Sequence, residues 1–269
     1  MNSQTDIQLL VLVRPSEKQP TSGLEKRMHA FLQTGDGSEN LDNKTFSSLH
    51  GTGQIADYLL WKRHFIAEMK AVNGYPAQRI ERLIDEELRV EPRTLVFGQV
   101  GIQKLLSSRT NGTEINRMMV HIGGRPIRKL LQLANPQIAD TRVKFGLPDA
   151  TGLAIILIDE PQKIEASVAA YAVREALKAS EPLLDEIDCV WVSLETHMVS
   201  LPGGRTGFPE LVISRANRLA EIDRVLMGKM LDAWAAFNGT EMDYLDHSGG
   251  WETLNPIGDG WPLILNLPS

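Results

Sequence analysis

The sequence predicts an α/β fold in which a mixed central β-sheet is flanked by helices. Apolar segments of strand length alternate with amphipathic helical segments along the 269 residues. Two short apolar runs early in the chain lie close enough together to form an antiparallel hairpin. Further along, a strand that is apolar on both faces precedes an amphipathic helix and another apolar strand, which is typical of a helix-covered sheet.

The first elements lead to the hairpin. Residues 7–13 are apolar and suit either a strand or the beginning of a helix, and residues 22–33 carry apolar side chains at helical spacing. Residues 34–44 are polar and rich in turn-forming residues, which indicates a loop. The runs 55–61 and 64–72 are separated by two basic residues and predict the two strands of the hairpin.

Helices dominate the segment after the hairpin. The spacing of apolar residues predicts helices over 75–90, from residue 113 onward, and over 127–145. Pro136 is expected to interrupt the last of these, because proline cannot donate the hydrogen bond that a helix interior needs. A short strand is predicted over 94–97.

Strands and helices alternate in the rest of the chain. Residues 151–158 and 187–194 are almost wholly apolar and predict buried strands, with a helix over 161–179 between them. A weaker strand is predicted over 210–214, and a long helix over 217–237. An exposed apolar face on this last helix would suit a homodimer.

Composition narrows the class of protein. The chain carries 28 basic and 34 acidic residues, and the net charge of −6 argues against a protein whose whole surface binds nucleic acid. The single cysteine, Cys189, lies in an apolar strand segment and excludes both an intrachain disulfide and a cysteine-rich zinc site. No apolar run approaches the roughly 20 residues of a membrane span, so a cytoplasmic protein is expected.

Three charged residues stand out in the apolar sequence of the predicted hairpin. Glu68 and Lys70 are two residues apart, so on a strand they project from the same face. If the two strands pair, Asp57 approaches both of them from the adjacent strand. Two neighbouring carboxylates repel each other unless a cation joins them, and a hard divalent ion such as Mg²⁺, with Mn²⁺ as a substitute, suits oxygen ligands. A nearby ammonium group could then assist an activated water in hydrolysing a phosphodiester.

The same pattern has a plain alternative. The tripeptide Glu-x-Lys is common, and on an exposed strand it usually means solvated charges. The apolar surroundings and the aspartate eleven residues earlier favour the site, and both interpretations remain open on the sequence alone.

Asp57 followed by Glu68-Met69-Lys70 resembles the signature of the PD-(D/E)XK nuclease superfamily, which has the restriction-endonuclease-like fold. Ala56 stands where that signature has proline. Residues 130–159 (LLQLANPQIADTRVKFGLPDATGLAIILID) also resemble a group of poorly characterised bacterial proteins of this superfamily. The resemblance covers about residues 20–195, in the order helix, strands with the acidic motif, helix, strand.

The resemblance implies a role for each matching residue. Asp57 and Glu68 would bind the metal with the main-chain carbonyl of Met69, and Lys70 would position or activate the water. Gln137 would correspond to a helix glutamine that some nucleases place near the active site; the alternative is an amide on the helix surface.

Two further residues each have a separate interpretation. Glu25 matches an additional acidic residue of some members, although in the first turn of a helix it also suits the helix dipole. Asn135 before the proline is interpreted as a helix cap.

The resemblance also divides the chain into regions. Residues 1–215 would form the nuclease-like domain with a helical insertion around 75–130, and residues 216–269 would be a C-terminal helix and acidic tail packed on it. Residues 93–148 contain nine basic residues and only two acidic ones, Glu114 and Asp140. This segment is therefore predicted to contact the phosphates of a nucleic acid, and DNA is favoured over RNA.

Three functions follow from the sequence. The first is a Mg²⁺-dependent endonuclease or exonuclease that uses Asp57, Glu68 and Lys70. The second is a catalytically silent protein of the same fold that binds nucleic acid or a partner protein. The third is a structural mixed-sheet protein in which the Glu-x-Lys pattern is accidental.

Overall fold

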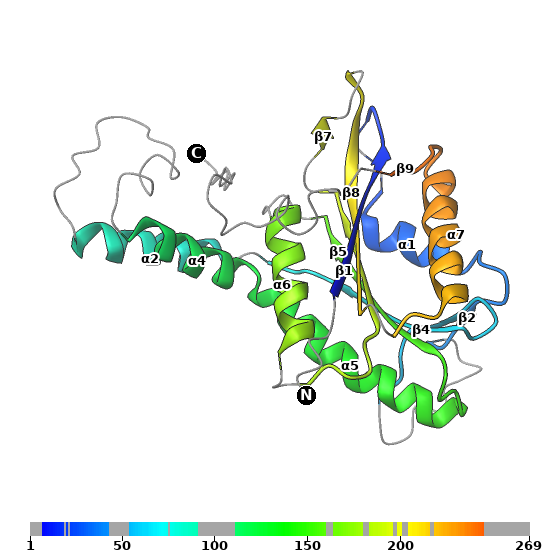
Figure 1. Cartoon of the computed structure of the whole chain (residues 1–269). Helices are drawn as coiled ribbons and strands as arrows, with labels where there is room; N and C mark the ends of the chain where they lie inside the picture. The colour runs from blue at the N-terminus through cyan, green and yellow to red at the C-terminus, as the bar shows by residue number, and fades with distance from the viewer. Residues whose placement is uncertain are drawn as a thin grey trace.

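A nine-stranded sheet with helices on both faces forms the body of the computed structural model (Figure 1). The structure describes residues 7–18, 20, 22–42, 54–74, 76–90, 111–159, 164–179, 183–195, 198–200, 204–215 and 218–244. Within these residues the strand order is β2-β3-β4-β5-β6-β8-β1-β9, and β7 pairs with β8. The predicted fold class, a mixed sheet flanked by helices, is confirmed.

The elements have the following bounds. The strands are β1 (Ile7–Pro15), β2 (Glu39–Asn40), β3 (Tyr58–Leu60), β4 (Phe65–Ala71), β5 (Thr151–Ile158), β6 (Cys189–Leu194), β7 (Val199–Ser200), β8 (Thr206–Arg215) and β9 (Asp243–Tyr244). The helices are α1 (Leu24–Leu32), α2 (Ala77–Val90), α4 (Gly112–Gly123), α5 (Arg125–Phe145), α6 (Ala166–Lys178) and α7 (Glu221–Phe237). None of the helices in the described residues is long and apolar enough to cross a bilayer.

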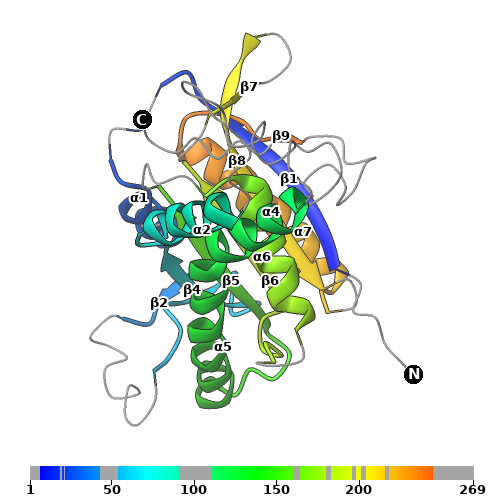
Figure 2. The same cartoon turned by 90° about the vertical axis from the view of Figure 1, so that its left-hand side faces the viewer.

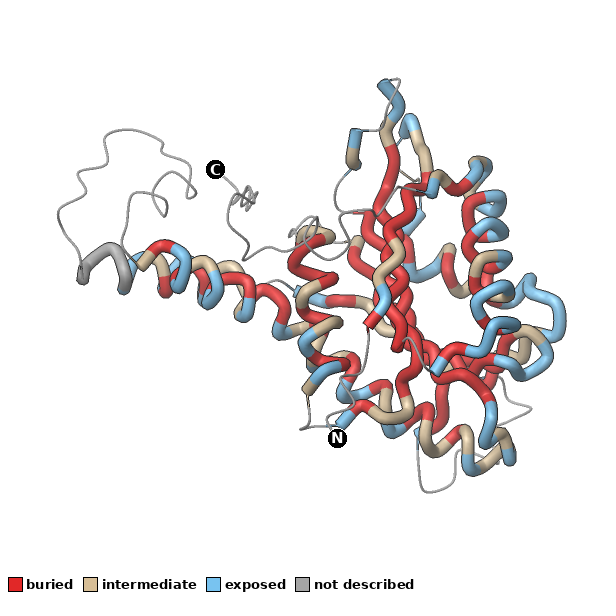
Figure 3. The backbone as a smooth tube through the Cα atoms, viewed as in Figure 1, coloured by how far each residue is buried: buried red, intermediate tan, exposed pale blue. Residues whose placement is uncertain are grey.

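The sheet is parallel only in its middle. Strands β2, β3 and β4 run antiparallel to one another, and the β3–β4 pair is the predicted hairpin. Strands β4, β5 and β6 are parallel, with α5 leading into β5 and α6 joining β5 to β6. Strands β8, β1 and β9 form the other side of the sheet, where β8 pairs antiparallel with β6 and with β1, and β9 pairs antiparallel with β1. The central strands are buried on both faces, because helices cover both sides (Figure 3).

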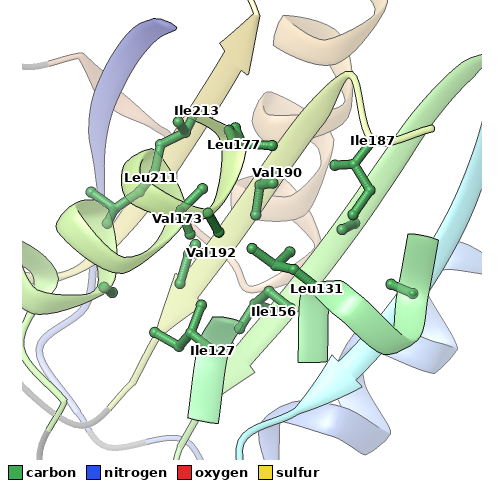
Figure 4. Close-up of a cluster of buried hydrophobic side chains, with 14 of the residues drawn as sticks. Ile127, Leu131, Ile156, Val173, Leu177, Ile187, Val190, Val192, Leu211 and Ile213 are labelled. Atoms are coloured by element: carbon green, nitrogen blue, oxygen red, sulfur yellow. The ribbon is translucent and has the colours of Figure 1, made fainter. Parts of the chain in front are cut away.

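Two hydrophobic cores separate the sheet from its helices. Helices α5 and α6 cover one face, and Figure 2 shows them in front of the sheet; Figure 4 shows the aliphatic core beneath them, including Leu131, Ile156, Val173 and Val190. Helices α1 and α7 cover the other face over a core that contains Trp191 and Trp234. Along β4, Phe65, Ala67 and Met69 enter the second core, as the alternation predicted.

Several expectations about individual elements were wrong. Pro136 does not interrupt α5, which is continuous, because its ring is exposed and the unpaired carbonyl of Gln132 one turn earlier lies at the exposed face of the helix. The weak strand at 210–214 is the ten-residue strand β8, and the loop over 34–44 contains β2. Gly207 lies where a Cβ would be 2.4 Å from the Val13 side chain, so glycine permits close pairing with β1.

Some predictions fall outside the described residues. These are the strand over 94–97, the first part of the basic segment up to residue 110, and the acidic tail after residue 244.

Candidate functional site

The β3–β4 hairpin brings Asp57 and Glu68 face to face. The register pairs Tyr58 with Ala67, so Asp57, which immediately precedes β3, lies opposite Glu68 in the middle of β4. Glu68 and Lys70 alternate with residues of the α1–α7 core, so their side chains project from the sheet face that α5 and α6 cover.

Direct contacts hold the three motif residues together. The backbone N–H of Asp57 donates to Oε2 of Glu68 at 3.1 Å, and the backbone N–H of Met69 donates to Oδ2 of Asp57 at 2.8 Å. Lys70 forms an ion pair with Oε1 of Glu68. The three side chains therefore converge, as their strand spacing predicted, and the alternative of solvated charges on an exposed strand does not fit Glu68, which is fully buried.

Burial disfavours the charged form of both acids. The pKa of Glu68 is raised to about 8, first by burial and then by the neighbouring Asp57 carboxylate, while Lys70 acts in the opposite direction. Burial also raises the pKa of Asp57, against the hydrogen bond from Met69 and the charge of Lys70. One ammonium group thus faces two carboxyl groups, and the pair has a deficit of positive charge.

The donor set fits a hard divalent cation. Both candidate ligands are carboxyl groups, and Oδ1 of the half-buried Asp57 makes no hydrogen bond with the described residues. The carbonyl of Met69 points to the same side of β4 as its N–H, which is the side of Asp57. Asp57, Glu68 and the Met69 carbonyl would hold the ion, which would relieve the repulsion between the two carboxylates.

Helix α5 positions the strand that carries Asp57. The hydroxyl of Thr141 is fully buried; it accepts the N–H of Ala56 at 2.7 Å and donates to the carbonyl of Gln137 at 2.7 Å. Sequence reasoning missed Thr141, although a hydroxyl on the apolar face of a helix is a signal that it needs a partner. Gln137 itself is 9% exposed on the sheet-facing side of α5, so it is not an amide of the helix surface.

Other predicted residues lie elsewhere. Glu25 is exposed in the first turn of α1, on the opposite side of the sheet, and makes no hydrogen bond or ion pair with the motif residues. Asn135 is not a helix cap, because it lies inside α5 and its side-chain oxygen accepts the N–H of Glu186 at 3.0 Å. Cys189 is buried, and burial raises the pKa of its thiol to about 12, so it is an inert core residue.

The described residues contain no group of three or more histidine, cysteine, aspartate or glutamate side chains that could hold a metal ion. From the described residues, a metal at the hairpin would have two carboxylates, complemented by main-chain oxygen and water. No family model matches the sequence, and neither a curated protein nor a solved structure is detectably similar to the chain.

Proposed function

We propose that the chain is a Mg²⁺-dependent nuclease that hydrolyses phosphodiester bonds in DNA or RNA. The observation that carries this proposal is the meeting of Asp57, Glu68 and Lys70 at one point of the hairpin, where the buried Glu68 and the half-buried Asp57 share a single ammonium. Such a deficit of positive charge is costly for a purely structural site and is relieved by a divalent cation.

Each residue has a defined task in this mechanism. Asp57 and Glu68 are metal ligands, and the N–H groups of Met69 and Asp57 fix the orientation of their carboxylates. The Lys70 side chain, which is 24% exposed, reaches from the buried Glu68 toward solvent, where it can orient the attacking water or stabilise charge on the phosphate. When bound, Mg²⁺ supplies Lewis acidity and lowers the pKa of a coordinated water.

The order of the elements supports the same proposal. Helix α1 precedes the antiparallel strands β2, β3 and β4, and α5 then leads into β5, which lies parallel to β4. This is the order helix, strands with the acidic motif, helix, strand that the resemblance to the PD-(D/E)XK superfamily implies. The motif residues occupy the central hairpin of that arrangement.

A catalytically silent protein of the same fold is the second candidate. The observation that favours it is that both side-chain oxygens of Glu68 already accept hydrogen bonds, one from the Asp57 N–H and one from Lys70. Such a protein would keep the fold and bind nucleic acid or a partner protein without cleaving it.

Cleavage assays test the catalytic proposal. Supercoiled plasmid, linear duplex and single strands are incubated with the wild-type protein in Mg²⁺, in Mn²⁺ and in EDTA. We expect metal-dependent cleavage that falls at least about 100-fold in Lys70→Ala. The matched control is Lys26→Ala, which removes an exposed lysine from α1 on the other side of the sheet. Cleavage that persists in Lys70→Ala contradicts the proposed mechanism.

A Mn²⁺ titration separates the two candidates. Metal binding that is lost in Glu68→Ala, together with cleavage, supports the nuclease. Nucleic-acid binding without Glu68-dependent metal binding and without cleavage of any substrate supports the silent protein. Absence of Glu68-dependent metal binding contradicts the metal site itself.

A further inference from the structure

A line of basic side chains follows the outer surface of α4 and α5. Arg117, His121, Arg125 and Lys129 recur every four residues, about 6 Å apart along a helix axis, and all four are exposed. Helix α4 continues into α5 with little break, because Gly124 keeps helical backbone angles and its N–H bonds to the carbonyl of Val120 (Figure 1). Residues of two helices therefore form one ridge.

The ridge cations have no acidic partners among the described residues. Arg117, Arg125 and Lys129 form no ion pair there, whereas Arg142 further along α5 is bound to Glu186 and Asp188. This difference divides the basic residues of the predicted nucleic-acid-binding segment into two groups. Arg117, Arg125 and Lys129 are available to a ligand, whereas Arg142 has a structural role.

One cation of a third element, Arg174 of α6, lies near the same ridge. The pKa of His121 is lowered by burial and then by the charges of Arg128 and Arg125, and Glu175 of α6 is the acid that opposes this effect. Burial and then Glu175 raise the pKa of the half-buried Tyr171. The charges of Arg117, Arg128 and Arg174 of α6 oppose this effect. The α4–α6 surface is thus a basic patch with one aromatic ring, although the whole chain is acidic.

We infer that this α4–α6 patch, formed by Arg117, His121, Arg125, Lys129, Arg128, Arg174 and Tyr171, binds the phosphate backbone of a nucleic acid. Exposed arginines that form no ion pair with the described residues, such as Arg117 and Arg125, suit phosphates, and a partly exposed tyrosine offers a stacking surface to an unpaired base. Helices α5 and α6, which carry part of the patch, cover the same face of the sheet from which Glu68 and Lys70 project, and α4 contacts both of these helices. The inference rests on the proposed function, because it supplies the substrate-binding surface of that nuclease.

Binding without metal separates this inference from catalysis. Fluorescence anisotropy in EDTA measures the affinity for a labelled single strand and for a duplex of equal length, with polyglutamate as an acidic protein-like competitor. The test variant is the triple substitution Arg117→Ala, Arg125→Ala and Lys129→Ala. The control is Lys26→Ala, Arg224→Ala and Lys229→Ala, which makes the same charge change at exposed positions of α1 and α7. Thermal unfolding checks that both variants are folded.

We expect the test variant to bind at least about tenfold more weakly at 0.1 M salt, and the control to stay within about twofold of wild type. The slope of log affinity against log salt should fall by about 2 for the single strand or about 3 for the duplex. Tighter binding of the single strand would assign Tyr171 a stacking role, and tighter binding of the duplex would limit the patch to the backbone.

Four results would overturn the inference: no binding by wild type, equal affinity of the test variant and wild type, equal loss in the control, or preferential binding of polyglutamate. The variant Asp57→Asn distinguishes the two proposals. Patch-dependent binding without any cleavage by wild type refutes the nuclease and keeps the patch, and cleavage that is lost in Asp57→Asn and unaffected by the triple substitution refutes the patch and keeps the nuclease.

Discussion

Two glutamates of the same sheet are fully buried, and their surroundings differ. Glu210 on β8 receives hydrogen bonds from the ring N–H groups of Trp191 at 2.9 Å and Trp234 at 3.0 Å, from the Ser193 hydroxyl at 3.0 Å, and from Arg14 at 3.3 Å. Arg14 is itself 2% exposed and also pairs with a second acid. The carboxylate of Glu210 is therefore surrounded by donors and a cation.

Glu68 on β4 has a different environment. It receives one backbone N–H and one ammonium, and it lies beside the carboxyl group of Asp57, which burial also keeps from ionising readily. The α1–α7 side of the sheet thus contains a buried carboxyl group that is surrounded by donors and a cation from the protein. The hairpin contains a buried carboxyl group with fewer donors and with a second acid beside it.

The comparison teaches which kind of buried acid indicates a functional site. Burial of a carboxylate is not by itself evidence for a site, because a saturated network such as that of Glu210 contributes to folding. A buried acid next to a second acid, with too few cations, is better explained by an ion or a substrate that completes it.

The largest effect on the free energy of unfolding is expected at Glu210, the buried acid that is surrounded by donors. Glu210→Ala leaves two indole N–H groups without an acceptor and deprives Arg14 of a partner, so the free energy of unfolding should fall by about 3 kcal/mol or more. Urea denaturation at neutral pH measures this. Glu210→Gln retains one oxygen acceptor and should lose less. A loss below about 1 kcal/mol in the alanine variant would mean that the network is not stabilising.

A smaller effect of opposite sign is expected at the hairpin. Because the pKa of Glu68 is raised to about 8 in the folded protein, the wild type without metal should lose stability as the pH rises from about 4.5 to about 8. Glu68→Gln lacks this titration, so in EDTA its stability relative to wild type should increase by about 2 kcal/mol between about pH 6.5 and about pH 8. Parallel stability curves for the two proteins would show that Glu68 ionises as easily as in the unfolded chain.

The smallest effect is expected at Thr141, which connects α5 to Ala56, the residue before Asp57. Thr141→Val keeps the shape of the side chain and removes the acceptor of the Ala56 N–H, at a cost of about 1 kcal/mol. Thr141→Ser keeps the hydroxyl and should retain more of the stability. Chemical denaturation of both variants checks this order; equal losses would assign the effect to packing.

Much of the hairpin site was predictable from the sequence. Asp57, Glu68 and Lys70 are close in sequence, and the two-residue period of strands requires Glu68 and Lys70 to share a face. A short connection between apolar runs then brings Asp57 to them. These are local properties, so they survive without knowledge of the rest of the chain.

The partners of the site were not predictable in this way. Thr141 is 85 residues from Ala56 along the chain, and Arg174 of the α4–α6 patch lies on a helix outside the basic segment. The length of β8 was underestimated because the sequence does not show that the whole strand pairs with β1, which its glycine approaches closely. Helix α5 was expected to break at Pro136, and exposure of that position decided otherwise.

By itself, the amino-acid sequence determined the fold class, the hairpin and the meeting of its three charged residues, because hydrophobic periodicity and strand alternation act over a few residues. Only the tertiary structure decided which buried acid is saturated with donors and which is not. It also decided which arginines have acidic partners and which form a surface. Hydrogen bonding and charge pairing depend on groups brought together from distant elements, and the sequence order does not contain those distances.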